Sequence, residues 1–325
     1  MSDLYHIPHD DGRTYRMKKF VEYQHEVPSI HYRFLGEWIK KYRFDREEAV
    51  DMCWYMSVTY NEITCALLNE LRFPPEYVWK KYKDKLNFGS ARKYAKNMDW
   101  FVPLMTEWRR LTQGIPYEWV LSKKGNSPVQ TYRNIHKALC GINHVGRFAA
   151  DLFMECLVYL KDWLRLDIRE PLNLEWDKCA NLTSGLFNLM YEDEKANNFD
   201  RERRTSIRDK IELTNELLKV QEEIRNTYPE QDSDVTMFIG KICSFRNLFK
   251  GARYGGFHHD RELGVIRQYE ADFPEYCSLW RKCYELRKEI FPNHLLGELN
   301  GWAGIRKERK KLWLERGLTG VEKGA

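Results

Sequence analysis

Prolines divide this sequence into segments of helical length, and this punctuation is the feature that most restricts its fold. Proline lacks a backbone N–H and clashes with the preceding turn, so it usually marks the ends of helices. Strand-like alternation of apolar and polar residues is nearly absent between the breaks. We therefore expect an all-α, multi-helix fold. The breaks fall at Pro28, Pro74-Pro75, Pro103, Gly114 to Pro116, Gly125 to Pro128, Pro171, Pro229, Pro274 and Pro292.

The length of 325 residues allows one large domain or two modest ones. Residues 1–14 are polar and rich in turn formers, so we expect a flexible N-terminal arm. We interpret residues 15–325 as a single helical catalytic domain. At about 197–230 the composition becomes charged with only a narrow apolar stripe, which predicts a solvated helical protrusion.

Aromatic and basic residues together indicate a nucleic-acid partner. Aromatic residues make up 14% of the chain, and their flat faces can line a groove and stack on bases. The net charge of +5 is mild but unevenly distributed. Between residues 241 and 267 basic side chains outnumber acidic ones, and local positive density of this kind favours a phosphate-bearing partner.

The eight cysteines include no C-x-x-C pair, so we expect buried free thiols in a reducing cytoplasm rather than structural zinc. The first residues lack an apolar leader, and no apolar run approaches membrane-spanning length. We expect a soluble intracellular protein with no membrane partner. No cofactor is indicated, and the sequence leaves a metal requirement open.

The run from Gly251 to Gly264, G-A-R-Y-G-G-F-H-H-D-R-E-L-G, has the composition of a phosphate site. Its glycines allow close backbone approach, and its cations could face an anion. An ordinary helix-to-helix turn flanked by surface charges is the alternative. Our candidate residues for binding substrate or phosphate are Arg246, Lys250, Arg253, Tyr254, Gly255, Gly256, His258 and Arg261.

A second informative stretch, residues 137–160, contains a glycine-bounded turn before an apolar helix that we expect to begin near Val145. Such a turn can present free backbone N–H groups to a DNA phosphate, although a plain corner between two helices has the same pattern. The candidate DNA-backbone contacts are Gly141, Asn143, Gly146 and Arg147.

A core helix is predicted within residues 46–71, where apolar residues recur at helical spacing. We assign its polar positions Tyr60, Asn61 and Glu62 to a solvated face, with an inward-facing site as the alternative. Farther along, Asp177 lies near the start of another helix, where it either favours the helix N-terminus or faces a substrate.

Taken together, these parts resemble the phage amino acid:DNA transferases, also called α-glutamyl/putrescinyl-thymine pyrophosphorylases, over roughly residues 30–316. The resemblance rests on the aromatic helical N-terminal region, the glycine turn, the Asp177 segment and the basic aromatic run from Arg246 to Arg261. It implies an architecture similar to that of DNA glycosylases, with a helix-hairpin-helix-like element. The implied reaction replaces pyrophosphate on 5-pyrophosphorylated hydroxymethyluracil in double-stranded DNA with an amine or amino acid, in the cytoplasm of the infected bacterium.

The resemblance also suggests roles for individual residues. Asp177, Asp260 and His259, with His258 as a further candidate, could accept the proton that the amine must lose. Lys250, Arg253, Arg261 and the Gly255-Gly256 backbone could hold the departing pyrophosphate.

Other functions remain open on the sequence alone. They are a helical DNA glycosylase and a non-catalytic DNA-binding protein. We disfavour a helical histidine-aspartate phosphohydrolase, because its upstream histidine is missing between His144 and His258.

Overall fold

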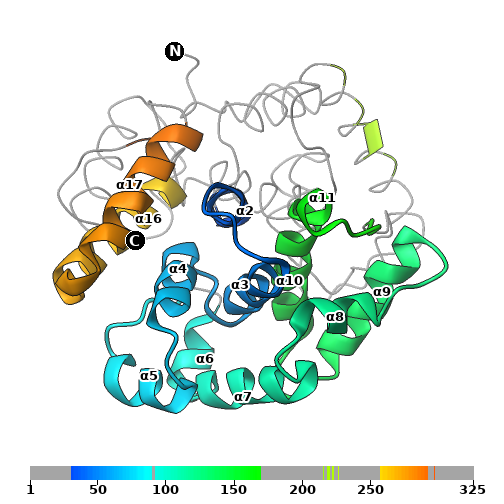
Figure 1. The fold of residues 1–325 in the computed structure, drawn as a ribbon, viewed down its shortest axis with the longest axis horizontal. Coiled ribbons are helices and arrows are strands. Elements are labelled where there is room, and N and C mark those ends of the chain that lie inside the picture. Colours follow the sequence, from blue (N-terminus) through cyan, green and yellow to red (C-terminus); the bar gives the residue numbers. More distant parts are fainter. Residues whose placement is uncertain are drawn as a thin grey trace, which may run out of the picture. The chain divides into compact units, whose positions relative to one another are not determined.

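The computed structural model describes residues 31–89, 92–169 and 257–291, together with positions 215, 218, 219, 222, 226 and 296. Helices supply the regular structure in these ranges, and no strand occurs there, which confirms the expected all-α class (Figure 1). The helices are α2 (His31–Lys41), α3 (Arg46–Thr59), α4 (Glu62–Leu71), α5 (Pro75–Tyr82), α6 (Lys93–Asn97), α7 (Phe101–Thr112), α8 (Pro116–Leu121), α9 (Pro128–Cys140), α10 (Arg147–Tyr159), α11 (Lys161–Leu164), α16 (Phe257–Asp272), the 3-10 turn η3 (Pro274–Tyr276) and α17 (Cys277–Ile290).

Contacts divide the chain into two compact units. One unit comprises residues 30–171 and 262–291 and holds most of the described residues. The other comprises residues 1–29, 172–261 and 292–325, of which the structure describes the first residues of α16 and the six scattered positions. The expected N-terminal arm lies outside the described residues. So does most of the expected protrusion, although its five described positions are helical and exposed.

Prolines set several helix starts, as the sequence predicted, and capping residues set others. Helices α5, α8 and α9 each carry proline at their first residue, where the missing N–H has no intrahelical partner to lose. Side chains cap the starts of α3, α4 and α9. Asp45 accepts a hydrogen bond from Glu48 N, Asn61 accepts one from Thr64 N, and Ser127 accepts one from Gln130 N. Caps of this kind stabilise a helix by about 1 kcal/mol each.

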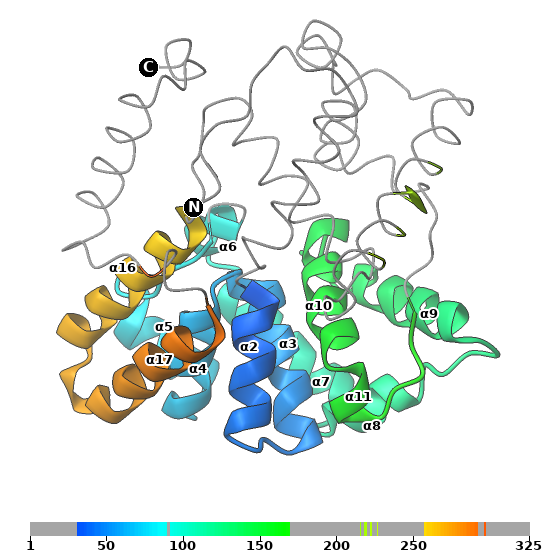
Figure 2. The ribbon, with the colours of Figure 1, turned by 90° about the horizontal axis from the view of Figure 1, so that it is seen from above.

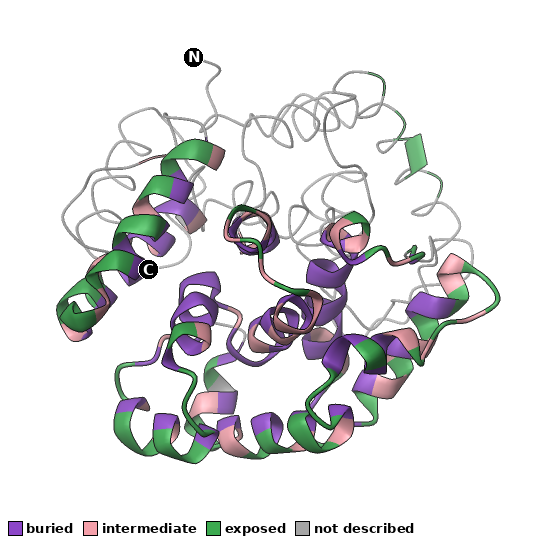
Figure 3. Ribbon diagram, in the orientation of Figure 1, coloured by how far each residue is buried: buried purple, intermediate pink, exposed green. Residues whose placement is uncertain are grey.

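The core of the first unit is built around α3 and α10, which pack against each other (Figures 1 and 2). Residues 149–158 of α10 are all buried, and α3 is buried around most of its circumference (Figure 3). A helix without a continuous polar face is one that other helices surround. Helix α4 also packs on α3, and α2 and α9 pack on α10. No described helix is long and apolar enough to cross a membrane.

Four large rings, the aromatic cluster, join α3, α7, α8 and α10. Trp54 and Trp108 stack with ring centroids 4.6 Å apart and planes 8° from parallel. Trp119 and Phe153 meet Trp108 edge-on at 5.3 and 5.6 Å. Trp108 donates its indole N–H to Asp51 Oδ1 at 2.7 Å. Burial of this much ring surface makes the aromatic cluster a main source of stability for the unit.

The predicted core helix across residues 46–71 is in fact two helices. Tyr60 adopts a left-handed conformation with φ of 50° and ends α3, and Asn61 then caps α4. Gly89 fixes this break, because its N–H donates to Thr59 O at 2.8 Å. A Cβ on Gly89 would lie 2.3 Å from Tyr60 O, so only glycine fits there.

Candidate functional site

The break between α3 and α4 also corrects the solvated face that we assigned to its polar residues. Asn61 and Glu62 are 3% and 2% exposed, so both face inward. A backbone that turns at Tyr60 directs these side chains differently from a continuous helix, and the periodicity of residues 46–71 does not contain this information. The alternative assignment, an inward-facing polar site, is therefore the one that the structure supports for Asn61 and Glu62.

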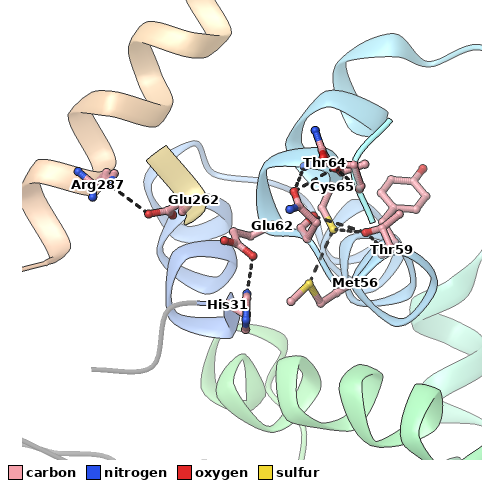
Figure 4. A network of polar contacts seen from close by, with 11 residues as sticks. His31, Met56, Thr59, Glu62, Thr64, Cys65, Glu262 and Arg287 are labelled. Atoms are coloured by element: carbon pink, nitrogen blue, oxygen red, sulfur yellow. Dashed lines mark hydrogen bonds and ion pairs between the residues drawn. The ribbon is translucent and has the colours of Figure 1, made fainter. Parts of the chain in front are cut away.

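Glu62 belongs to a buried group of four charged or titratable side chains, the carboxylate cluster, which consists of His31, Glu62, Glu262 and Arg287. They come from α2, α4, α16 and α17 and lie within one compact unit. His31 Nδ1 lies 2.6 Å from Glu62 Oε2, and Arg287 Nε donates to Glu262 Oε2 at 3.2 Å. Figure 4 shows the side chains in order from Arg287 through Glu262 and Glu62 to His31.

Burial and like charge act together on Glu262, which is 1% exposed. Burial raises the pKa of Glu262 well above its usual range, and the charge on Glu62 raises it further. Arg287 opposes both effects without reversing them. Glu262 Oε1 has no hydrogen-bond partner within the described ranges. A carboxyl in such surroundings favours its protonated, neutral form.

Glu62 lies in a setting more favourable to charge. It is the first residue of α4, where the helix dipole and free N–H groups stabilise an anion. It also pairs with His31. Two carboxyl groups whose surroundings differ in this way can divide the roles of proton acceptor and proton donor.

A hydrogen-bonded network fixes the start of α4 beside α16. Thr64 Oγ1 lies 2.6 Å from Tyr269 Oη and 2.7 Å from Asn87 O. Tyr269 Oη in turn accepts from Asn87 N at 2.7 Å. Because Thr64 and Tyr269 are buried, this network holds Glu62 and Glu262 in a defined geometry.

The outermost member of the carboxylate cluster is His31, whose side chain is 13% exposed. Its ring also lies 4.6 Å from that of Tyr60. An imidazole held by a carboxylate is the usual arrangement of a general base. Among the described residues, no group of three or more His, Cys, Asp or Glu is placed to hold a metal ion.

The histidine-rich end of the glycine run forms the start of α16 rather than a loop. His259 and Asp260 are buried, and His258 and Arg261 are half-buried. Asp260 lies in the first turn, where its charge favours the helix. All four residues belong to the unit that contains residues 172–261. Seven other candidates lie outside the described residues: Asp177, Arg246, Lys250, Arg253, Tyr254, Gly255 and Gly256.

The glycine turn connects α9 to α10, and α10 begins at Arg147, two residues later than expected. Gly141 and Gly146 have φ of −80° and −75°, values open to any residue, and the left-handed position is His144. A helix-hairpin-helix identity is therefore not confirmed. Gly141, Asn143 and Gly146 are exposed and Arg147 is half-exposed, and their contact with DNA stays a prediction.

Sequence reasoning did not single out His31, Glu262 or Arg287, and it placed Glu62 at an inward-facing site only as the alternative. Its one usable signal was Asn61-Glu62, a capping residue followed by an acid, which marks a helix start. Comparisons of the chain with known protein families, with curated proteins and with solved structures find no match.

Proposed function

We propose that this protein is an amine:DNA transferase that replaces pyrophosphate on 5-pyrophosphorylated hydroxymethyluracil with an amino acid or polyamine. The observation that carries the proposal is the His31–Glu62 pair, backed by Glu262. The attacking amine is protonated at neutral pH, so the reaction needs a proton acceptor whose own charge state is controlled. A histidine held by a buried carboxylate meets this need.

In the proposed reaction the amine loses one proton before the substitution and one after it. The amine loses one proton to His31, and Glu62 stabilises the imidazolium that forms. The amine nitrogen then bonds to the exocyclic carbon of the base, and the bond from that carbon to the pyrophosphate oxygen breaks. Pyrophosphate leaves with the electron pair. The second proton, carried by the newly bonded nitrogen, passes to solvent.

Charge in the carboxylate cluster suits a cationic co-substrate. Ionising Glu262 beside Glu62 would place two negative charges against the single positive charge of Arg287, which is why Glu262 favours its neutral form. An approaching ammonium ion would neutralise the excess, and its positive charge would lower the cost of ionising Glu262. This electrostatic complementarity favours an amine over an anionic or neutral nucleophile.

Parts of the proposal rest on sequence alone. The cations of the glycine run would bind the leaving pyrophosphate, and Asp177 would face the base. The exposed glycine turn before α10 would contact the DNA backbone. The natural setting of such an enzyme is phage DNA in the cytoplasm of the infected bacterium.

The test is incubation of the full-length protein with pyrophosphorylated hydroxymethyluracil DNA and a panel of amino acids and polyamines, followed by nucleoside mass spectrometry and a pyrophosphate assay. We expect a thymine adduct of one amine and one pyrophosphate released per adduct. Free base with abasic sites would instead identify a glycosylase. No mass change with any amine would contradict the proposal.

A further inference from the structure

Helices α9 and α10 bring a second set of reactive side chains together, away from the carboxylate cluster. His136 and Cys140 lie one helical turn apart on α9, on the same face. His136 Nδ1 is 3.8 Å from Cys140 Sγ, and His136 Nε2 is 2.9 Å from Asp151 Oδ1 on α10. A thiol, an imidazole and a carboxylate in this order form the arrangement that activates a nucleophile.

The imidazole of this trio carries a positive charge at neutral pH. Burial lowers the pKa of His136, but the hydrogen bonds with Asp151 and Cys140 outweigh it and raise the pKa to about 9. Asp151 is itself buried and lies one turn before Glu155, whose pKa is raised well above its usual range by burial and by Asp151. A charged imidazolium beside a sulfur stabilises the thiolate, the form of cysteine that reacts.

Cysteines elsewhere in the described ranges lack this combination. Cys53, Cys65, Cys156 and Cys283 are buried, and burial raises the pKa of the last three of these thiols. Cys277 is exposed, and no histidine of the described ranges contacts it.

Cys140 and Cys277 form a natural pair for comparison, because both are exposed and they occupy opposite helix ends. Cys277 is the first residue of α17, at the positive end of the helix dipole. Cys140 is the last residue of α9, at the negative end of the helix dipole. Dipoles alone therefore predict that Cys277 reacts faster, whereas the contact with His136 predicts the reverse.

We propose that Cys140, His136 and Asp151 form a relay that makes Cys140 a reactive thiol and a site of modification by small disulfides. The Cys140 thiolate attacks one sulfur of the disulfide, and a new S–S bond forms as the old one breaks. The second sulfur leaves as a thiolate with the electron pair. His136 contacts the attacking sulfur, and Asp151 holds His136 in place.

The experiment treats the full-length protein at pH 7 with limiting oxidised glutathione and, separately, with iodoacetamide, and follows each cysteine-containing peptide by mass spectrometry. Cys140 should react about tenfold faster than Cys277 with both reagents. His136→Gln should remove this advantage and leave the rate of Cys277 unchanged. Asp151→Asn should lower the Cys140 rate by a smaller factor, and Cys140→Ser confirms the peptide assignment.

Two results would overturn the proposal. One is a Cys140 rate equal to or below that of Cys277 in the unaltered protein, a comparison that needs no variant. The other is a fast Cys140 rate that persists in His136→Gln while Cys277 is unchanged. If His136→Gln loosens the fold, the buried cysteines will react as well, and Asp151→Asn then decides whether the relay exists.

Discussion

Two buried regions of the same compact unit are built from opposite materials. The aromatic cluster of Trp54, Trp108, Trp119 and Phe153 fills its space with stacked and edge-on rings. The carboxylate cluster places two acids, a guanidinium and an imidazole at comparable depth. Burying aromatic rings away from water is favourable, whereas burying carboxylates costs free energy unless partners compensate for the lost water.

The difference separates a region that stabilises the fold from the region to which we assign the proposed reaction. Replacing buried ionic groups by well-packed apolar residues is often neutral or stabilising, so stability alone does not explain the carboxylate cluster. Perturbed pKa values concentrate at functional sites.

Trp108→Ala should lower the free energy of unfolding by about 3–5 kcal/mol, because it removes the stack with Trp54 and leaves a cavity. Chemical denaturation followed by circular dichroism measures the change. Phe73→Ala is the control, since that ring is 42% exposed and its loss should change stability by less than about 1 kcal/mol. A similar small effect for Trp108→Ala would remove the contrast between the two regions.

Arg287→Met should destabilise the protein by about 2–3 kcal/mol at neutral pH, because Glu262 would lose its buried hydrogen-bond donor and could then be buried only in its protonated form. The loss should shrink at acidic pH, where this glutamate is protonated in the unfolded protein as well. In a double-mutant cycle, Glu262→Gln should restore most of the stability, since no charge then needs a partner. If Arg287→Met lowers the stability equally in the unaltered protein and in the Glu262→Gln variant, packing rather than charge explains the effect.

Asp51→Asn should raise stability at pH 7.5 by about 1–2 kcal/mol. Burial raises the pKa of Asp51 to about 6, despite the hydrogen bond from Trp108. The folded state therefore binds this proton more tightly than the unfolded state. Stability from this group is present below its ordinary pKa and is lost as the pH rises through about 6.

Asparagine keeps the acceptor oxygen for Trp108 and removes the charge. The gain in melting temperature should therefore be seen at pH 7.5 and vanish near pH 3.5, with no loss of the proposed transferase activity. A gain that is independent of pH would point to a cause other than ionisation.

His136 should make the smallest contribution, about 1 kcal/mol, with its own dependence on pH. Its pKa is about 9 in the folded protein, above the ordinary 6.5. The stability it provides is complete below pH 6.5 and disappears as the pH rises through about 9. The difference in melting temperature between the unaltered protein and His136→Gln should shrink over this interval. An unchanged difference would show that the ion pair with Asp151 contributes nothing.

Local sequence signals predicted the helices well. Pro75, Pro116 and Pro128 begin helices where the punctuation placed breaks, because their chemistry acts on neighbouring backbone. Pro103 was wrong as a break: it lies in the first turn of α7, where proline is tolerated.

The carboxylate cluster could not be predicted in the same way. Glu62 and Glu262 are two hundred positions apart in the numbering, and no periodicity reports which helices pack together. The turn at Tyr60 further depends on contact with Gly89, which is distant from it in sequence. Tertiary contacts of this kind override local patterns.

Glu62 is the member of the carboxylate cluster shared by His31 and Glu262, so replacing its carboxylate by an amide tests whether the carboxylate cluster serves the proposed reaction. The measurement is the initial rate of amine transfer to pyrophosphorylated hydroxymethyluracil DNA by Glu62→Gln, with Glu270→Gln as the exposed control on α16. We predict a loss of at least about a hundredfold for Glu62→Gln, with the fold retained, and no loss for Glu270→Gln. A folded Glu62→Gln protein that transfers the amine at the unaltered rate would contradict the account.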